Sequence, residues 1–252
     1  MSYFDFDHKR LFYTITGTGK PLLLLHGNTV SSKMFDPIVS LLSEKNTVIR
    51  MDFLGCGQSE RLAKWPTDLW YHWGQQAAAL LRYLGLRGVN VIGSSGGALA
   101  ALNLALEYPA LINAVAADSF EGVRADASLT EQIRSGRSYA KQMERFRLMQ
   151  REMHGDDWER VLDADTEAVI DHAEHIGHFF HRPLSCLNRK LLLTGSAEDE
   201  MFPKGHYEKL FAMICAETPY ASKHIFEHGG HPAMMSNAKE FIPLCEAFFS
   251  DN

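Results

Sequence analysis

The sequence predicts an α/β fold with a mostly parallel central sheet and helices on both of its faces. Short apolar segments of strand length alternate along the chain with segments whose hydrophobic spacing is helical. This alternation is typical of parallel strands buried between two helical layers. The chain has 252 residues, of which 46% are hydrophobic, and this is enough for one large core. We therefore expect a single domain over residues 1–252.

The expected elements of the first half alternate after an initial hairpin. Residues 8–10 join the two hairpin strands, and a glycine-rich turn at residues 17–21 precedes the next strand. Gly85 lies just beyond one helix and Pro109 just beyond another, as is typical of helix ends. In order, the expected elements are strands 3–7, 11–16 and 22–25, helix 33–42, strand 47–51, helix 69–84, strand 89–92 and a helix that ends at Tyr108.

The second half contains one segment that breaks the alternation, residues 121–188. It is polar, shows a helical pattern without a clear strand, and is rich in Arg, Glu, Met, His and aromatic residues. Because it separates two core strands, we expect a helical insertion that covers the functional site as a lid. Around it the sequence predicts strands 112–118, 190–194 and 223–226 and helices 204–215 and 237–249.

Charge and cysteine content exclude several classes of protein. The formal net charge is −6 and there is no basic stripe, so we expect no nucleic-acid partner. Residues 1–7 lack the features of a signal peptide, and no apolar run approaches the ~20 residues that span a bilayer. We therefore expect a cytoplasmic protein without a membrane partner. No cysteine pair has Cys-x-x-Cys spacing, which favours reduced thiols over disulfides or a zinc site. The cysteines are Cys56, Cys186, Cys215 and Cys245.

The most informative motif is Gly-x-Ser-x-Gly at residues 93–97, which follows an apolar strand and opens a helical segment. A strand, a tight turn and a helix in this order expose the Ser95 hydroxyl above the edge of the sheet. The small residues on both sides let the backbone bend sharply. We therefore expect Ser95 to be a nucleophile, whereas Ser94, one position off the pattern, is expected to pack in the core or to support the site residues from behind.

A nucleophilic serine needs a base, and the sequence offers His231. His231 lies on a glycine-containing loop between the last expected strand and the last expected helix, so it can reach back over the sheet edge. His228 is the local competitor. The chain order serine, acid, histidine favours His231.

The acid that orients the histidine is expected on the loop just beyond a strand, where its carboxylate can accept the imidazole N–H and fix the tautomer. Three neighbouring carboxylates compete there, and Asp199, four residues before Pro203, is favoured over Glu198 and Glu200. Asp118, at the end of an earlier strand, is a further rival that can approach the same histidine from another loop.

An oxyanion hole needs two N–H donors aimed at the attacked carbonyl oxygen. Gly96 opens the helix after the serine, so its N–H is one expected donor. The other is expected on the loop after His26-Gly27, where a strand ends, and Asn28 N–H is the simplest choice.

Five segments together resemble the α/β-hydrolase superfamily over nearly the whole chain, with the insertion as the least matched part. The resemblance implies the α/β-hydrolase fold with a helical lid, and a serine nucleophile similar to that of esterases and lipases. The matching segments are the His-Gly oxyanion motif at residues 26–28, the Asp-x-x-Gly-x-Gly-x-Ser loop at 52–59, the nucleophile elbow at 93–97, the acid loop at 195–203 and the histidine loop at 230–232.

The sequence departs from relatives in this superfamily at two places. The acid loop usually carries Asp three residues after its glycine, where this sequence has Glu198, and Asp199 comes one residue later. Haloalkane dehalogenases and epoxide hydrolases carry Asp at the elbow position that Ser95 occupies here. Asn28 resembles the Asn after His-Gly in the dehalogenases, but without an Asp nucleophile it is expected to act as a donor only.

Four histidines recur every three residues within the insertion, a spacing at which helix neighbours can share a ligand. Steps of three also drift around the helix and spread the four side chains over a wide arc. We therefore expect a polar or pocket-lining face rather than a metal site. The four are His172, His175, His178 and His181.

These residues predict a serine hydrolase that cleaves a small carboxylic ester or related acyl compound through a covalent acyl-enzyme, without a metal or organic cofactor. Its expected partner is therefore a small-molecule acyl substrate. Carbon–carbon bond hydrolases and amidases or aminopeptidase-like enzymes share the elbow and remain alternatives. A ligand-sensing signalling protein on the same fold is the alternative from another class. The sequence leaves the substrate and the oligomeric state open.

Overall fold

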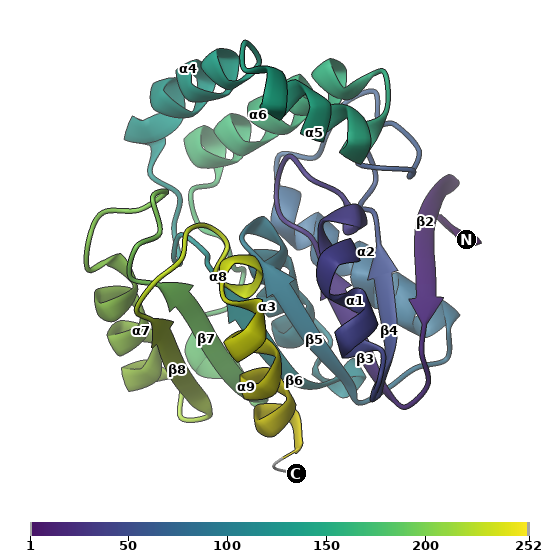
Figure 1. Cartoon of the computed structure of the whole chain (residues 1–252), viewed down its shortest axis with the longest axis vertical. Helices are drawn as coiled ribbons and strands as arrows, with labels where there is room; N and C mark the ends of the chain where they lie inside the picture. Colours follow the sequence, from purple (N-terminus) through teal and green to yellow (C-terminus); the bar gives the residue numbers. More distant parts are fainter. Residues whose placement is uncertain (1, 251–252) are drawn as a thin grey trace.

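Eight strands form one sheet in the computed structural model, which describes residues 2–250 (Figure 1). Their order in the sheet is β1-β2-β4-β3-β5-β6-β7-β8. β2 pairs antiparallel with β1 and β4, and all other neighbours are parallel. The strands are β1 (Ser2–Phe6), β2 (Lys9–Thr16), β3 (Lys20–Leu25), β4 (Asn46–Met51), β5 (Val89–Ser94), β6 (Ile112–Asp118), β7 (Lys190–Ser196) and β8 (Ala221–Phe226).

Helices cover both faces of this sheet, as the sequence predicts (Figure 1). One face packs against α2 (Leu69–Tyr83), α3 (Gly96–Glu107) and α7 (His206–Glu217). The other packs against α1 (Asp36–Leu42), α8 (Ala233–Ser236) and α9 (Ala238–Ser250).

The uninterrupted apolar run in β3 follows from this double cover. Leu22 and Leu24 belong to the core on the α1 and α9 side, whereas Leu23 and Leu25 belong to the core on the α2 and α3 side. Successive side chains of a strand point to opposite faces. When both faces are buried, every position of the strand therefore favours an apolar residue.

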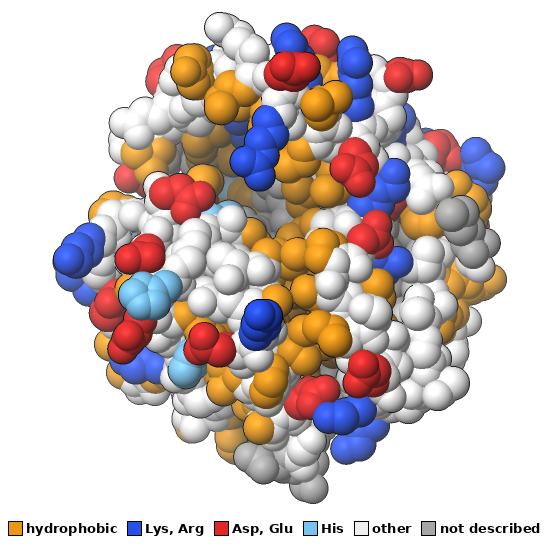
Figure 2. Space-filling view, viewed as in Figure 1, with side chains coloured by type: hydrophobic (Ala, Val, Ile, Leu, Met, Phe, Trp, Pro, Cys, Tyr) orange, Lys and Arg blue, Asp and Glu red, His pale blue; other side chains and the backbone are white. Residues whose placement is uncertain are grey.

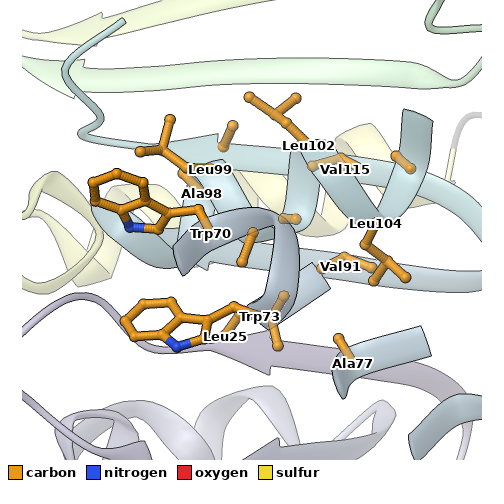
Figure 3. Packing of buried hydrophobic residues seen from close by; sticks show 14 of the residues in the cluster. Leu25, Trp70, Trp73, Ala77, Val91, Ala98, Leu99, Leu102, Leu104 and Val115 are labelled. Atoms are coloured by element: carbon orange, nitrogen blue, oxygen red, sulfur yellow. The ribbon is translucent and has the colours of Figure 1, made fainter. Parts of the chain in front are cut away.

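α2 and α3 pack tightly against each other on one face of the sheet (Figure 3). The side chains of Trp70 and Trp73 lie on the α2 side of this layer, and Leu99 lies on α3. Gly74 makes the close approach possible, because a Cβ atom there would stand 3.1 Å from both Asn103 Cβ and the Leu104 backbone nitrogen. The contact holds α3, and therefore its first turn, rigidly against the sheet.

Between β6 and β7 the chain leaves the sheet as the predicted helical insertion. It contains α4 (Thr130–Ala140), α5 (Glu144–His154) and α6 (Trp158–His175), which lie beyond the carboxyl ends of the parallel strands (Figure 1). Its only strand-like pairing among the described residues is an isolated bridge between Arg124 and His178. Figure 2 shows a hollow between this insertion and the rest of the molecule, bordered by hydrophobic side chains.

Two expected elements are modified in the structure, and one short helix was not expected. The helix expected at 33–42 is a 3-10 turn (Ser32–Phe35) followed by α1, whose first turn contains a proline that favours a new helix start. β3 begins at Lys20, inside the expected turn, because Lys20 already pairs with Asn46 of β4. The last expected helix, 237–249, is α9 within one residue, and the short helix α8 before it was not expected. Within residues 2–250, no helix is both long and apolar enough to cross a bilayer.

Candidate active site

Ser95 is the single residue that joins β5 to α3, and its backbone conformation is strained. Its φ of 55° and ψ of −124° lie in a region that residues with a side chain rarely adopt. Its N–H donates to the Asp118 carbonyl at 2.8 Å, and its own carbonyl accepts from Ala98 N–H at 2.9 Å. Ser95 is partly exposed, whereas Ser94 is fully buried and its hydroxyl has no partner among the described residues.

The flanking glycines are required by close backbone contacts. A Cβ at Gly93 would lie 2.2 Å from the Gly97 carbonyl oxygen, and a Cβ at Gly97 would lie 2.1 Å from the Leu25 carbonyl oxygen. Both distances are far below van der Waals contact. The motif spacing is therefore explained by sterics at the point where β3, β5 and α3 meet.

His231 and Asp199 come together from two different loops. His231 follows β8, Asp199 follows β7, and His231 Nδ1 lies 2.9 Å from Asp199 Oδ2. The His231 side chain is 15% exposed and that of Asp199 only 2%. Within the described residues no hydrogen bond joins Ser95 to His231. In proteins without bound substrate such bonds are often long and shorten when substrate binds.

Asp199 is held by three donors. Besides His231, the Tyr207 hydroxyl donates to Oδ2 at 2.7 Å and the Met201 N–H donates to Oδ1 at 2.9 Å. Burial alone would raise the pKa of Asp199, but the hydrogen bonds from His231 and Tyr207 outweigh it and lower that pKa below its ordinary value. The carboxylate is therefore kept ionised and fixed in orientation beside the imidazole.

The neighbouring carboxylates of the acid loop make other contacts. Glu200 accepts the backbone N–H of His231 at 3.1 Å, so it holds the histidine loop rather than the ring. Glu198 lies at the surface, 3.6 Å from the exposed His228.

Asp118 lies between the serine turn and the histidine loop and contacts both. Its buried carboxylate accepts the Thr194 hydroxyl at 2.7 Å and the Met234 N–H at 3.1 Å, and its carbonyl accepts from Ser95. It therefore anchors the serine turn and the segment just after His231. Burial raises the pKa of Asp118 to about 6, although these hydrogen bonds oppose the shift.

The loop after β3 lies directly against the serine. A Cβ at Gly27 would stand 3.0 Å from Ser95 Cβ, and a Cβ at Gly96 would stand 2.0 Å from Asn28 Oδ1. Gly96 N–H is in the first turn of α3, where a helix offers no acceptor. The Asn28 backbone N–H likewise donates to no group among the described residues. Gly96 follows Ser95 in the chain and Asn28 contacts Gly96, so within the described residues two backbone N–H groups without a partner belong to residues next to the serine turn.

His26, the first residue of this loop, has a structural role. Phe53 N–H donates to His26 Nε2 at 3.2 Å, so Nδ1 carries the proton, and it lies 2.8 Å from the Gly27 carbonyl oxygen. Burial lowers the pKa of His26 and keeps the ring neutral. Its two bonds join the loops after β3 and β4.

Two contributors to this site are absent from the sequence-based prediction, Tyr207 and Asp165. Tyr207 gave no signal beyond a buried position on α7. Asp165 did carry a signal, because it lies on the same face of α6 as Leu162 and Val169, where an apolar residue is expected. It is completely buried, and its Oδ2 accepts the Asn28 side-chain amide at 2.8 Å.

The four histidines of the insertion are dispersed. His172 is buried against Trp70 and Phe179, and burial lowers its pKa. His181 stacks on Tyr71, and His175 lies 3.0 Å from Asp171 at the surface. No three metal-ligating side chains among residues 2–250 gather into a site.

Comparison with known proteins gives the family. A model of the alpha/beta hydrolase family matches residues 22–244, and the chain therefore belongs to that family. A proline iminopeptidase of Clostridium botulinum is 33% identical over 112 residues, which are 43% of this chain and 38% of the relative. The chain thus matches less than half the length of such curated relatives.

Solved structures with the same fold cover the whole chain. A meta-cleavage product hydrolase variant of Pseudomonas fluorescens IP01 superimposes with a TM-score of 0.77 at 18% identity and covers 100% of this chain and 98% of its own. The enol-lactonase of Burkholderia xenovorans LB400 gives a TM-score of 0.75 at 17% identity, with 99% and 100% covered. At these identities the likeness shows the α/β-hydrolase fold alone.

Proposed function

We propose that the protein is a serine hydrolase that cleaves a small carboxylic ester or related acyl compound. The observation that carries the proposal is the Asp199–His231 pair, 2.9 Å apart, at the same edge of the sheet as the strained Ser95 turn. Membership of the alpha/beta hydrolase family and fold likeness to an enol-lactonase support the reaction class.

In the proposed mechanism His231 takes the proton of Ser95 as its oxygen attacks the substrate carbonyl carbon. Asp199 holds the ring with Nδ1 protonated, which leaves Nε2 free to act as the base. The N–H groups of Asn28 and Gly96 bind the oxyanion that forms. His231 then protonates the leaving group, and water, activated by the same histidine, hydrolyses the acyl-enzyme.

The helical insertion is proposed to act as a lid over this site, and the hollow beneath it to receive the acyl group. Its position beyond the carboxyl ends of the strands is where α/β sheets bind ligands. The hydrophobic border of the hollow favours an apolar acyl chain (Figure 2).

The first experiment measures hydrolysis of p-nitrophenyl esters from acetate to long chains by the wild type, Ser95→Ala and Ser94→Ala. We expect Ser95→Ala to lower kcat by at least about 10³-fold, because it removes the nucleophile. Ser94 is the matched control, since its buried hydroxyl has no hydrogen-bond partner within residues 2–250 and its loss should leave kcat within about threefold. Equal activity of wild type and Ser95→Ala would overturn the mechanism.

An amide substrate is the second candidate, favoured by the similarity to a proline iminopeptidase. Prolyl p-nitroanilide tested with the same three proteins distinguishes it, because an iminopeptidase would cleave this amide faster than any ester of the series. A carbon–carbon bond hydrolase or a ligand-sensing protein is indicated if the folded wild type turns over neither class. Thermal stabilisation by a ligand that is never consumed would then favour sensing.

A further inference from the structure

The loop that bears Asn28 is bonded to the helical insertion through a buried carboxylate. Asp165 of α6 is completely buried, and its Oδ2 accepts two donors of this loop. The Asn28 side-chain amide donates at 2.8 Å and the Thr29 backbone N–H at 3.3 Å. Asp165 therefore holds both the side chain of Asn28 and the backbone of the next residue.

The other end of the Asn28 amide is also bound. Its Oδ1 accepts the Trp70 indole N–H at 3.0 Å, so both ends of the amide are fixed and the side chain cannot rotate. This side chain packs directly on Gly96, whose Cα leaves just enough room for it. The orientation of Asn28 thus depends on one residue of α2 and one of α6.

The loop is held at a third point by α5. The Thr29 carbonyl lies 2.9 Å from the donating Gln150 side-chain amide and 3.1 Å from His154 Nε2. Thr29 itself has a φ of 61°, a left-handed conformation that a threonine adopts only where its surroundings impose it. The insertion therefore imposes the path of the chain immediately after Asn28.

The charge of Asp165 is balanced by Arg137 of α4. Arg137 Nη1 lies 2.6 Å from Asp165 Oδ1, and the same nitrogen donates to the Thr166 hydroxyl at 3.1 Å. A bare carboxylate bonded to the Asn28 side chain would strongly repel the negative charge that the proposed mechanism develops at the Asn28 N–H, because the setting is buried. The guanidinium offsets that repulsion and keeps the carboxylate available for Asn28.

We propose that Asp165 and Arg137 are positioning residues for the oxyanion hole, so that the insertion shapes the reaction site as well as covering it. This inference rests on the proposed function. Asp165 orients Asn28 beside Ser95, and Arg137 neutralises the carboxylate that does so.

The test is a double-mutant cycle of Arg137→Gln and Asp165→Asn, with kcat and KM measured separately on the best p-nitrophenyl ester. Arg137→Gln leaves the carboxylate uncompensated, and we expect kcat to fall about tenfold to hundredfold with KM within about threefold. Asp165→Asn keeps an oxygen for Asn28 but removes the charge. In the double variant we therefore expect kcat to recover to within about threefold of wild type.

Arg134→Gln is the matched control. Arg134 also joins α4 to α6, through Glu167, but this pair lies at the surface and does not touch Asn28. We expect its kcat to equal that of wild type. Circular dichroism melting of all variants verifies that each is folded at the assay temperature.

A fluorophosphonate probe separates the two proposals, with labelling detected by intact mass and Ser95→Ala as the reference that lacks the reactive hydroxyl. If the wild type is neither labelled nor active on esters, the proposed function fails. If the wild type is labelled and active but Arg137→Gln behaves like Arg134→Gln, the positioning role fails. The role is also refuted if the two substitutions of the cycle are simply additive.

Discussion

At the scale of single residues, Asp199 is the carboxylate that contacts His231, and two further donors, Tyr207 and the Met201 N–H, fix its orientation. The sequence favoured Asp199 but left Glu198 and Glu200 on the same loop, and Asp118 on another, as alternatives, because a spacing does not determine where a loop turns. In the structure Asp199 bonds the imidazole, and Tyr207 bonds the same oxygen of Asp199. Each rival carboxylate has another set of partners.

Tyr207→Phe is expected to lower the free energy of unfolding by about 1–3 kcal/mol at pH 7, because it removes a hydrogen bond to a buried, charged carboxylate. The bond from Tyr207 is one cause of the lowered pKa of Asp199. A lowered pKa contributes stability that is present above the ordinary value of 3.8 and is lost as the pH falls through the folded-state pKa. The difference between variant and wild type should therefore shrink below about pH 4.

Urea unfolding at pH 7 and at decreasing pH measures this effect. Tyr220→Phe is the control, since Tyr220 is 58% exposed, and we expect a change within about 0.5 kcal/mol. A Tyr207→Phe variant as stable as wild type at pH 7 would show that the hydroxyl does not support Asp199.

At the scale of elements, the start of α3 is set by glycines at the contact with β3. Gly97→Ala would place a methyl group 2.1 Å from the Leu25 carbonyl oxygen and 2.6 Å from that of His26. Both are backbone atoms that cannot rotate away. We expect a loss of about 1–3 kcal/mol in the free energy of unfolding, measured by urea denaturation.

Gly136→Ala is the opposite case on the same chain. Gly136 lies inside α4 with nothing within 4 Å of its would-be Cβ, so alanine should stabilise the helix by up to about 1 kcal/mol. Equal effects of the two substitutions would contradict the steric explanation of the Gly-x-Ser-x-Gly motif.

The element boundaries show what periodicity can and cannot predict. The strands β5 and β6 and the helix α2 were predicted within two residues, because apolar runs and Gly or Pro stops are local signals. β3 is likewise within two residues, and the two that were missed, Lys20 and Pro21, are ordered by pairing with β4 rather than by their own propensity. The short helix α8 was not predicted, and Asn237 at its end donates its side-chain amide to the His228 carbonyl of the histidine loop, a contact that depends on the tertiary fold.

At the scale of the whole molecule, Asp118 at the end of β6 bonds the serine turn, β7 and the segment after His231. Its buried carboxyl also makes the stability of the fold depend on pH. Burial raises its pKa from 3.8 to about 6. A raised folded-state pKa means that the folded protein holds the proton more tightly than the unfolded chain. Its stabilisation is therefore complete below about pH 3.8 and is lost as the pH rises through about 6, on the order of 3 kcal/mol in all.

Asp118→Asn should remove most of this loss between pH 4 and pH 7. Asparagine keeps an oxygen for the Met234 N–H and offers its amide to the Thr194 hydroxyl oxygen. Urea unfolding at several pH values gives the slope, and Asp156→Asn, at an exposed position, should reproduce the wild-type slope. An unchanged slope in Asp118→Asn would mean that its carboxyl is ionised in both states.

The sequence by itself determined the class of fold, the strained turn at Ser95 and the loops that carry His231 and Asn28. These follow from signals that act over a few residues: alternating burial, glycine conformations and helix stops. Only the tertiary structure decided which carboxylate meets His231 and that Asp165, Arg137 and Tyr207 lie within the same network of contacts. Those contacts join residues up to 137 positions apart, and a hydrogen bond between two loops depends on how the whole core places their ends.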